Sequence, residues 1–451
     1  LRKISGALNV GMDKVLPDAL VLAFVLSIIA YLLCIFIAGS TPLDTIVYWG
    51  KGFWGLLEFS MQMALIIAIG YMVSEAPIIK RGLIALCRIP KNGVQGVIFI
   101  GIASTILGWI SWGLGLVAGA ILARTVALNL RKIDFKLYVA VAYAGAISSG
   151  LFGISGSEFL LVNTPDYIFE DWLGLIPLSE TVFEPTLLIQ QLVGLIIVVP
   201  VLAALMHPSA KEAKEMPKDI LDRFLAQEEA MEELKTNRKP KSEMTFAERV
   251  DNSWITTTII GFAGLVYLVY WFATEGFDLN LNIMNMLLLF ISILAHGSPA
   301  NLLAAAEEGV RSAFGVLLQF TFYAGIQGML SGSGMVTIIS DAFSANSTAE
   351  TFPYLCYICM AIINFFIPSS GGIFAVCGEA LGTAALNVGL EPNKFVIAFT
   401  SGETISNIIQ PFWAIPLLGI AGLKMKDIMG YCIVFFVVLT AIWFGLWAIM
   451  W

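Results

Sequence analysis

The chain has 451 residues, of which 58% are hydrophobic and 13% are charged, and its mean hydropathy is +0.85. This composition excludes an ordinary soluble globular protein, because such proteins carry about 25% charged residues. The net charge of −8 says less about orientation in the membrane than the positions of the charges do, because Lys and Arg in short loops set the orientation of membrane proteins. The sequence therefore predicts an all-α polytopic membrane protein.

Apolar segments long enough to cross a bilayer as helices, which takes about 20 residues, recur along the chain. Nine transmembrane helices are predicted at 18–38, 55–76, 137–160, 185–206, 254–273, 280–296, 310–331, 394–418 and 428–450. Two further apolar stretches, 94–128 and 351–385, are longer than one span and contain Gly-rich or Pro-containing turns. Each is predicted to be a re-entrant hairpin, although a double crossing of either stretch would leave the topology unchanged.

The charges in the connections predict the orientation. Lys and Arg gather in 77–92, 131–136, 207–252 and 424–426, whereas the loops assigned to the other side are mainly acidic. Because cytoplasmic loops are enriched in Lys and Arg, the basic side is predicted to be cytoplasmic. This places the N-terminus in the cytoplasm and predicts a multi-pass inner-membrane protein.

The two halves of the chain align with each other at an offset of 257, as Pro42 with Pro299 and Gln62 with Gln319 show. Five predicted crossings separate equivalent elements, and because five is odd, the second copy must be inverted, as in many secondary transporters. The predicted domains are inverted repeat 1 at 18–206 with its hairpin at 94–128, a cytoplasmic linker at 207–252, a connecting transmembrane helix at 254–273, and inverted repeat 2 at 275–451 with its hairpin at 351–385.

Four interruptions of the helices are predicted near mid-membrane. The hairpin tips are 108–115 and 365–372, and the spans that follow are interrupted at 147–157 and 402–411. Irregular backbone at membrane depth is tolerated only where it is buried in protein or lines a wet cavity. Half-helix N-termini can bind a carboxylate, and unwound carbonyls with Asn, Ser or Thr can bind Na⁺. The interruptions therefore predict sites for a substrate anion and a cation.

The predicted site residues belong to these four interruptions. Substrate binding is predicted for Ser111, Trp112, Gly113, Gly115, Ser148, Ser149, Ser369, Ser370, Gly371, Gly372 and Asn407. Coupling to Na⁺ or H⁺ is predicted for Asn364, Glu403, Thr404 and Ser406. The alternative for glycines such as Gly115 is that they only allow close helix packing.

Intramembrane carboxylates are costly and usually functional, and Glu403 is the leading candidate for a coupling group. Glu58 and Glu158 are expected nearer the outer interface or in pairs, and Glu379 on the return arm of the second hairpin. Gln62 and Gln319 are expected to tie helices together rather than touch substrate.

The two tips differ in polarity. The second offers hydroxyls and open amides from Ser369 to Gly372, whereas Trp109, Ile110, Trp112 and Leu114 surround Ser111 with apolar surface. A dicarboxylate would place its second charge against the tryptophans, at a desolvation cost. The asymmetry therefore favours a short monocarboxylate.

Longer motifs resemble the bacterial short-chain fatty acid transporter family over nearly the whole chain. They are 52–67, 111–119, 363–372, 402–403 with 407–413, and 427–432. The resemblance implies the ion-transporter superfamily of carboxylate carriers, with paired re-entrant hairpins, a homodimeric scaffold domain and elevator-like movement of a transport domain. One departure is visible, since the second tip reads Ser369-Ser370-Gly371 where Ser-Gly-Gly is expected.

The predicted function is secondary active transport of short-chain fatty acids, similar to butyrate and acetoacetate, by a cation-coupled elevator mechanism. A carrier of C4-dicarboxylates or other small organic anions, and an anion channel, remain alternatives. An enzyme is not expected, because the sequence has no P-loop, nucleophile elbow or metal-ligand motif. No cofactor is expected beyond Na⁺ or H⁺ as coupling ion, and no nucleic acid partner.

Overall fold

The computed structural model describes residues 19–130, 133–208, 216, 220–222, 224–226 and 241–451. All regular elements within these residues are helical, which confirms the predicted all-α class. Eight helices or helix runs in this part of the chain are long and apolar enough to cross a membrane: 57–75, 93–110, 112–130, 135–162, 185–206, 254–274, 299–332 and 425–450. Each of the nine predicted spans coincides with one helix or with consecutive helices.

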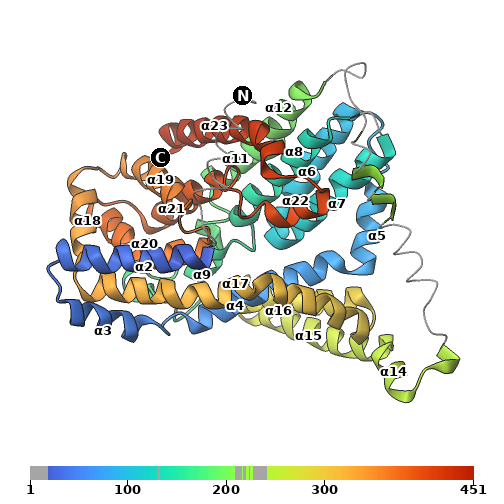
Figure 1. The fold of residues 1–451 in the computed structure, drawn as a ribbon, viewed down its shortest axis with the longest axis horizontal. Coiled ribbons are helices and arrows are strands. Elements are labelled where there is room, and N and C mark those ends of the chain that lie inside the picture. The colour runs from blue at the N-terminus through green and yellow to red at the C-terminus, as the bar shows by residue number, and fades with distance from the viewer. Residues whose placement is uncertain (1–18, 131–132, 209–215, 217–219, 223, 227–240) are drawn as a thin grey trace.

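Six helices form a first layer, along the lower side of the molecule in Figure 1. They are α2 (Ala19–Phe36), α3 (Pro42–Gly52), α4 (Leu57–Glu75), α15 (Trp254–Thr274), α16 (Leu281–His296) and α17 (Pro299–Gly332). The long α17 packs against α2, α3 and α4. Glycines allow this approach, because a Cβ on Gly52 would lie 2.9 Å from the Cα of Gly328, and one on Gly309 would lie 2.6 Å from the Ala68 carbonyl oxygen.

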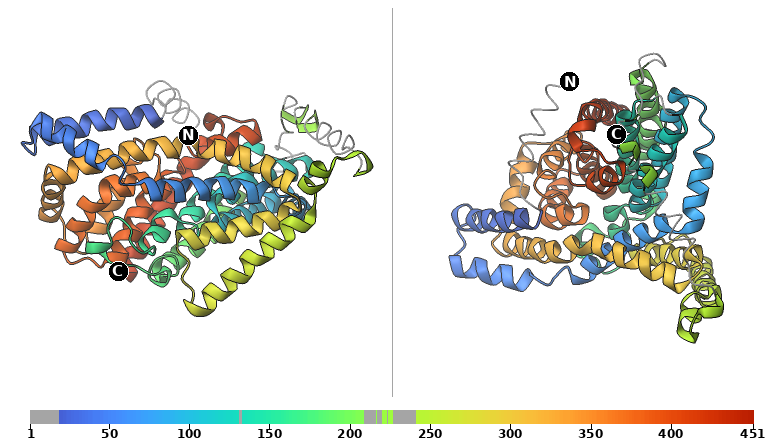
Figure 2. Two further views of the ribbon diagram at one scale, coloured as in Figure 1. Left: turned by 90° about the horizontal axis from the view of Figure 1, so that it is seen from below. Right: turned by 45° about the vertical axis from the view of Figure 1, so that its right-hand side comes forward.

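The second layer contains both hairpins and both interrupted spans (Figure 1). Its helices are α6 (Gly93–Ile110), α7 (Trp112–Leu130), α8 (Phe135–Phe152), α9 (Ser157–Val162), α11 (Pro185–Gln191), the π-helical η2 (Leu192–Val198), α12 (Val199–Met206), α19 (Phe352–Ile363), α20 (Ser370–Asn387), α21 (Pro392–Ser406), α22 (Ile415–Ala421) and α23 (Met425–Met450). In the right-hand view of Figure 2, the blue and ochre helices of the first layer run beneath the red, orange and teal helices of the second. Every residue of α8 is buried except Lys136, so α8 forms the centre of this layer.

The remaining elements connect the layers or lie in loops. The connecting helices are α5 (Pro77–Leu86) and α18 (Met335–Ala345). The short loop helices are α10 (Glu170–Leu173), η1 (Leu178–Glu180), η3 (Lys241–Glu243) and α14 (Phe246–Asp251). Most of the predicted linker 207–252 lies outside the described residues.

The helix starts follow the offset seen in the sequence. α3 begins at Pro42 and α17 at Pro299, and α8 begins at Phe135 and α21 at Pro392, so both pairs are 257 residues apart. α17 starts earlier than the predicted span 310–331, because Ser298 caps its N-terminus by accepting a hydrogen bond from the amide of Asn301 at 3.4 Å. The inverted orientation and the domain boundaries stay predictions.

The four predicted interruptions are present, and they differ in length. Only Ser111, with φ −156° and ψ 121°, separates α6 from α7. Residues 364–369 separate α19 from α20, residues 153–156 separate α8 from α9, and residues 407–414 separate α21 from α22. Both arms of the first hairpin are long enough to span a membrane, so the re-entrant course of 94–128 stays a prediction.

A thiol-labelling experiment tests the course of the second hairpin. Its flanks carry the exposed residues Glu350 and Glu391, and Phe366 is exposed at its tip. In a background without the partly exposed Cys359 and Cys377, cysteines at both flanks are expected to react with an impermeant reagent outside intact cells. Phe366→Cys is expected to remain unlabelled in inverted vesicles, because a re-entrant tip stays within the membrane. Labelling of the tip from the cytoplasmic side would show two full crossings.

Candidate functional site

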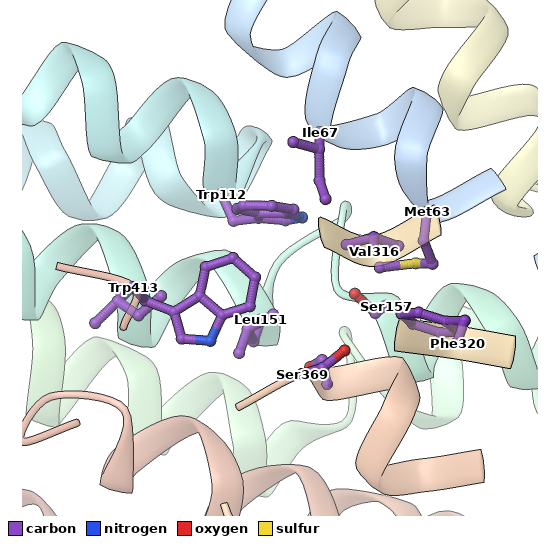
Figure 3. A pocket seen from close by; sticks show the side chains of 11 residues that line it. Met63, Ile67, Trp112, Leu151, Ser157, Val316, Phe320, Ser369 and Trp413 are labelled. Atoms are coloured by element: carbon purple, nitrogen blue, oxygen red, sulfur yellow. The ribbon is translucent and has the colours of Figure 1, made fainter. Parts of the chain in front are cut away.

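Two adjoining hollows lie between the layers, at the point where the interruptions meet. The larger has a volume of about 120 Å³ and the smaller about 20 Å³. Both are lined by Ile67, Trp112, Val316, Ser369 and Trp413, and we refer to them together as the central cavity. Figure 3 shows how α4, α7, α17 and the second tip contribute side chains to its smaller part.

The first tip supplies the aromatic wall of the central cavity. The extended backbone at Ser111 ends α6, and the amide of Trp112 donates to Ser155 Oγ at 3.1 Å, which fixes the start of α7. The Trp112 ring packs edge-on against Trp413, with 5.3 Å between ring centroids. Trp413, which lies within the interruption at 407–414, was not predicted as a site residue. Its position depends on the fold of 407–414 and cannot be read from spacing.

The second tip supplies the polar wall. Ser369 and Ser370 line the cavity at the N-terminus of α20, where first-turn amides have no carbonyl partner within the helix. A Cβ on Gly371 would lie 2.4 Å from Phe59 Cζ, and one on Gly372 would lie 2.6 Å from the Tyr323 ring. Glycines at these positions therefore let the α20 N-terminus approach α4 and α17 closely. This end of the cavity combines hydroxyls with the partial positive charge of a helix N-terminus.

Only part of the predicted substrate set lines the central cavity. Trp112, Gly113, Ser369 and Ser370 do so. The other seven are not among its lining residues: Ser111, Gly115, Ser148, Ser149, Gly371, Gly372 and Asn407. The Ser149 hydroxyl donates to the Gly145 carbonyl at 2.6 Å, and a Cβ on Gly115 would meet the Cα of Gly108 at 2.4 Å. For Gly115, the packing alternative describes its contacts best.

A substitution at Gly115 tests whether this glycine serves close helix packing. Gly115→Ala is expected to lower the thermal unfolding temperature in detergent, because backbone lies where the methyl group would go and such overpacking costs about 1–3 kcal/mol. Gly430→Ala is the matched control, since nothing lies within 4 Å of its added Cβ and alanine gains about 1 kcal/mol of helix propensity. Equal melting temperatures for the two variants would contradict the packing role.

The predicted cation residues form a buried cluster beside the second tip. The side-chain amide of Asn364 donates from Nδ2 to Asn407 Oδ1 at 2.7 Å, to Ser406 Oγ at 2.9 Å and to the Glu403 backbone carbonyl at 3.2 Å. The Ser406 hydroxyl donates to the same carbonyl at 2.8 Å. Asn407, predicted to bind substrate, also belongs to this cluster, and its contact with substrate stays a prediction. The Thr404 hydroxyl is buried and has no partner among the described residues.

A second buried carboxyl lies beside Glu403. Glu158 is fully buried on α9, in contact with Glu403 and Ser370, which agrees with the paired alternative, and its depth in the membrane stays a prediction. The Ser370 hydroxyl donates to Glu403 Oε2 at 3.1 Å. Ser370 thus connects the central cavity to the carboxyl pair. No group of three or more His, Cys, Asp or Glu side chains in the described residues could hold a metal ion.

The two glutamines that the sequence repeat pairs differ in their surroundings. Gln62 ties α4 to α16, as expected, by donating to Asn282 Oδ1 at 3.1 Å. Gln319 lies on the wall of the central cavity, and its expected role of joining helices stays a prediction. The sequence repeat pairs the two positions, but it carries no information about which of them faces the cavity.

Long apolar helices, interrupted spans and a cavity enclosed between two layers define a polytopic membrane transporter. Comparison with known proteins agrees, because residues 1–450 match the model of the short chain fatty acid transporter family. The chain belongs to that family. It is 36% identical over 431 residues to a protein of Escherichia coli (strain K12) and 34% identical over 439 residues to one of Haemophilus influenzae (strain ATCC 51907 / DSM 11121 / KW20 / Rd), covering 96% of each chain in both cases. Both relatives are named as candidate short-chain fatty acid transporters.

Solved structures share the fold at low identity. The YdaH transporter of Alcanivorax borkumensis superposes with a TM-score of 0.60 at 15% identity, over 96% of this chain and 98% of that chain. MtrF of Neisseria gonorrhoeae gives a TM-score of 0.50 at 14% identity, over 97% of this chain and 95% of that chain. These similarities concern the fold alone.

Proposed function

We propose that this transporter carries short-chain monocarboxylates similar to butyrate and acetoacetate across the bacterial inner membrane, coupled to a cation. The observation that carries the proposal is the polarity of the central cavity, where serines at a helix N-terminus face two tryptophans. The relatives from Escherichia coli and Haemophilus influenzae are named as candidate transporters of the same class of substrate.

The carboxylate end of the substrate is assigned to the second tip. Ser369 and Ser370 offer hydroxyls, and the first-turn amides of α20 offer N–H donors. A helix N-terminus favours negative charge by typically about 0.3–1 kcal/mol when exposed and up to about 2 kcal/mol when partly buried. Neither pocket lining contains a Lys or Arg side chain, so the proposed anion is held by dipoles and hydroxyls.

The hydrocarbon end is assigned to the aromatic wall. Trp112, Trp413, Ile67 and Val316 line both parts of the cavity. Each buried CH₂ contributes about 0.8 kcal/mol, so affinity is expected to rise from acetate to butyrate. The second carboxylate of a C4-dicarboxylate would lose its hydration against this wall with little compensation, which makes the dicarboxylate carrier the weaker alternative.

The proposed mechanism is elevator-like movement of the second layer against the first, with the cavity between them as the moving site. The small interface residues described above, such as Gly371 and Gly372 against α4 and α17, are where sliding surfaces would meet. A homodimer through the first layer is part of the same proposal, and so is a cytoplasmic N-terminus.

Counterflow tests the substrate class. In proteoliposomes preloaded with unlabelled butyrate, labelled butyrate is expected to exchange in a saturable way, with inhibition rising from acetate through propionate to butyrate. Succinate is expected to inhibit poorly. Inhibition by succinate as strong as by butyrate would favour a broader carboxylate carrier, and exchange that never saturates would favour an anion channel.

A further inference from the structure

We infer that Glu158 and Glu403 form one proton-binding unit, a carboxyl pair that shares a single proton and supplies the coupling ion of the carrier. The inference rests on the proposed function for the claim that transport is coupled to a cation. It deepens that function by naming the cation as a proton and by adding Glu158 to the residues that bind it. Neither the family description nor the repeat pattern pointed to Glu158.

The geometry of the pair is the first argument. Both side chains are fully buried, Glu158 on α9 just after the interruption at 153–156 and Glu403 on α21 just before the interruption at 407–414. The two carboxyls lie within interaction distance of each other. Two ionised carboxylates at such a contact repel each other strongly in a poorly hydrated site. A proton between them removes the repulsion and supplies a strong charge-assisted hydrogen bond.

The unpartnered oxygens are the second argument. Both carboxylate oxygens of Glu158 and Oε1 of Glu403 are buried without a hydrogen-bond donor in the described part of the chain. Burying such acceptors unsatisfied costs about 1–3 kcal/mol each, and more when they are charged. A shared proton lets one carboxyl donate to the other, which directly satisfies an oxygen that has no protein donor.

The surrounding charges are the third argument, because a nearby cation would make a proton unnecessary. Neither carboxyl forms an ion pair with Lys or Arg within the described residues. The polar groups that act on the pair are Ser370 and Asn407. Most titratable side chains on the elements packed against α9, α20 and α21 have partners elsewhere: Lys136 with Asp427, Lys394 with Glu391, Glu379 with Ser331, Tyr138 with Gly93, Tyr143 with Asn407, Tyr357 with Thr440, Tyr431 with Asp134 and His296 with Met72. The buried Tyr323, beside Gly372, has no hydrogen-bond partner for its hydroxyl within the described residues. The other titratable groups on these elements are the thiols Cys356, Cys359, Cys377 and Cys432, the half-buried Tyr354, whose ring packs against Phe444 and Trp447, and the exposed Arg311, Glu307, Glu308, Asp341 and Lys426.

Ser370 explains how the proton would be linked to the substrate. Its hydroxyl lies on the cavity wall and donates to Glu403. A substrate carboxylate at the second tip would therefore sit one side chain away from the pair. A doubly ionised pair would repel that anion, whereas a pair holding a proton would repel it less. Substrate and proton are then favoured together, which is thermodynamic coupling.

Infrared spectroscopy of the purified protein tests the pair without substrate or transport. At neutral pH in Na⁺-free buffer, wild-type protein is expected to show the carbonyl-stretch band of one buried protonated carboxylic acid, shifted in D₂O. Glu158→Gln and Glu403→Gln are each expected to remove the whole band, because the amide N–H replaces the proton as donor to the remaining carboxylate. Glu391→Gln, at an exposed carboxyl paired with Lys394, is the matched control and is expected to retain the band.

The other outcomes separate the inference from its rivals. Loss of half the band in each variant would show two independent acids and overturn the shared proton. A wild-type band that disappears when Na⁺ is added would show that Na⁺, not a proton, occupies the pair. The Na⁺ titration needs no variant, so it decides the question even if a substitution prevents folding. A retained band together with failed butyrate exchange would refute the proposed function and leave the pair intact.

Discussion

Replacing Trp112 with alanine is expected to weaken butyrate binding about tenfold while acetate binding changes much less. Trp112 lines both parts of the central cavity and packs against Trp413. Butyrate has two more CH₂ groups than acetate, and at about 0.8 kcal/mol for each buried CH₂ the full difference is about 1.6 kcal/mol. Since 1.4 kcal/mol corresponds to a tenfold change, losing most of this contact reduces the preference for butyrate by about tenfold.

Trp109→Ala is the matched control for this experiment. Trp109 belongs to the same hairpin tip, but its ring packs against Phe183 at 6.0 Å between centroids and is not part of the cavity wall. Inhibition constants for acetate, propionate and butyrate in the counterflow assay give the comparison. The monocarboxylate pocket is wrong if Trp112→Ala retains the wild-type chain-length preference, or if Trp109→Ala alters that preference as much as Trp112→Ala.

Glu403→Gln is expected to preserve butyrate exchange and to abolish stimulation by a pH gradient. The glutamine amide can donate to Glu158 as the protonated acid would, so the variant resembles the proton-loaded carrier. That state binds substrate and exchanges it, but it can no longer release a proton on the other side. Initial rates of exchange and of net uptake, measured in the same proteoliposomes, separate the two functions.

Glu391→Gln again serves as control and is expected to behave as wild type in both assays. Full pH stimulation in Glu403→Gln would reduce Glu403 to a structural residue. Coupling would then have to be assigned to Na⁺ at the cluster of Asn364, Ser406 and Asn407, whose hydrogen bonds to one another do not involve the Glu403 side chain.

The helices and their interruptions were predictable because their signals are local. Spans follow from apolar length, and the breaks at Ser111, 153–156 and 364–369 follow from Gly, Ser and Pro within those spans. The early start of α17 was missed although Ser298 and Pro299 form a recognisable helix N-terminus. The charged residues Glu307 and Glu308 led to the prediction of a loop in that part of the helix.

The composition of the candidate site was less predictable, because it depends on how distant elements pack. Glu158 lies on a short helix after an interruption, and only the return of α9 against α20 and α21 brings it to Glu403. Gln319 and Trp413 reach the cavity through the packing of the two layers. Ser149 and Gly115 have the residue types of a binding site, yet local backbone contacts occupy them.

One transport measurement tests the central claim, that a monocarboxylate in the central cavity moves together with a proton on the Glu158–Glu403 pair. Initial rates of labelled acetoacetate uptake are measured in proteoliposomes with either a proton gradient or a Na⁺ gradient, after subtracting the rates in protein-free liposomes, since uncharged acids cross bilayers unaided. The account predicts saturable uptake that an inward proton gradient accelerates in the complete absence of Na⁺. Uptake that requires a Na⁺ gradient and ignores the proton gradient would contradict it.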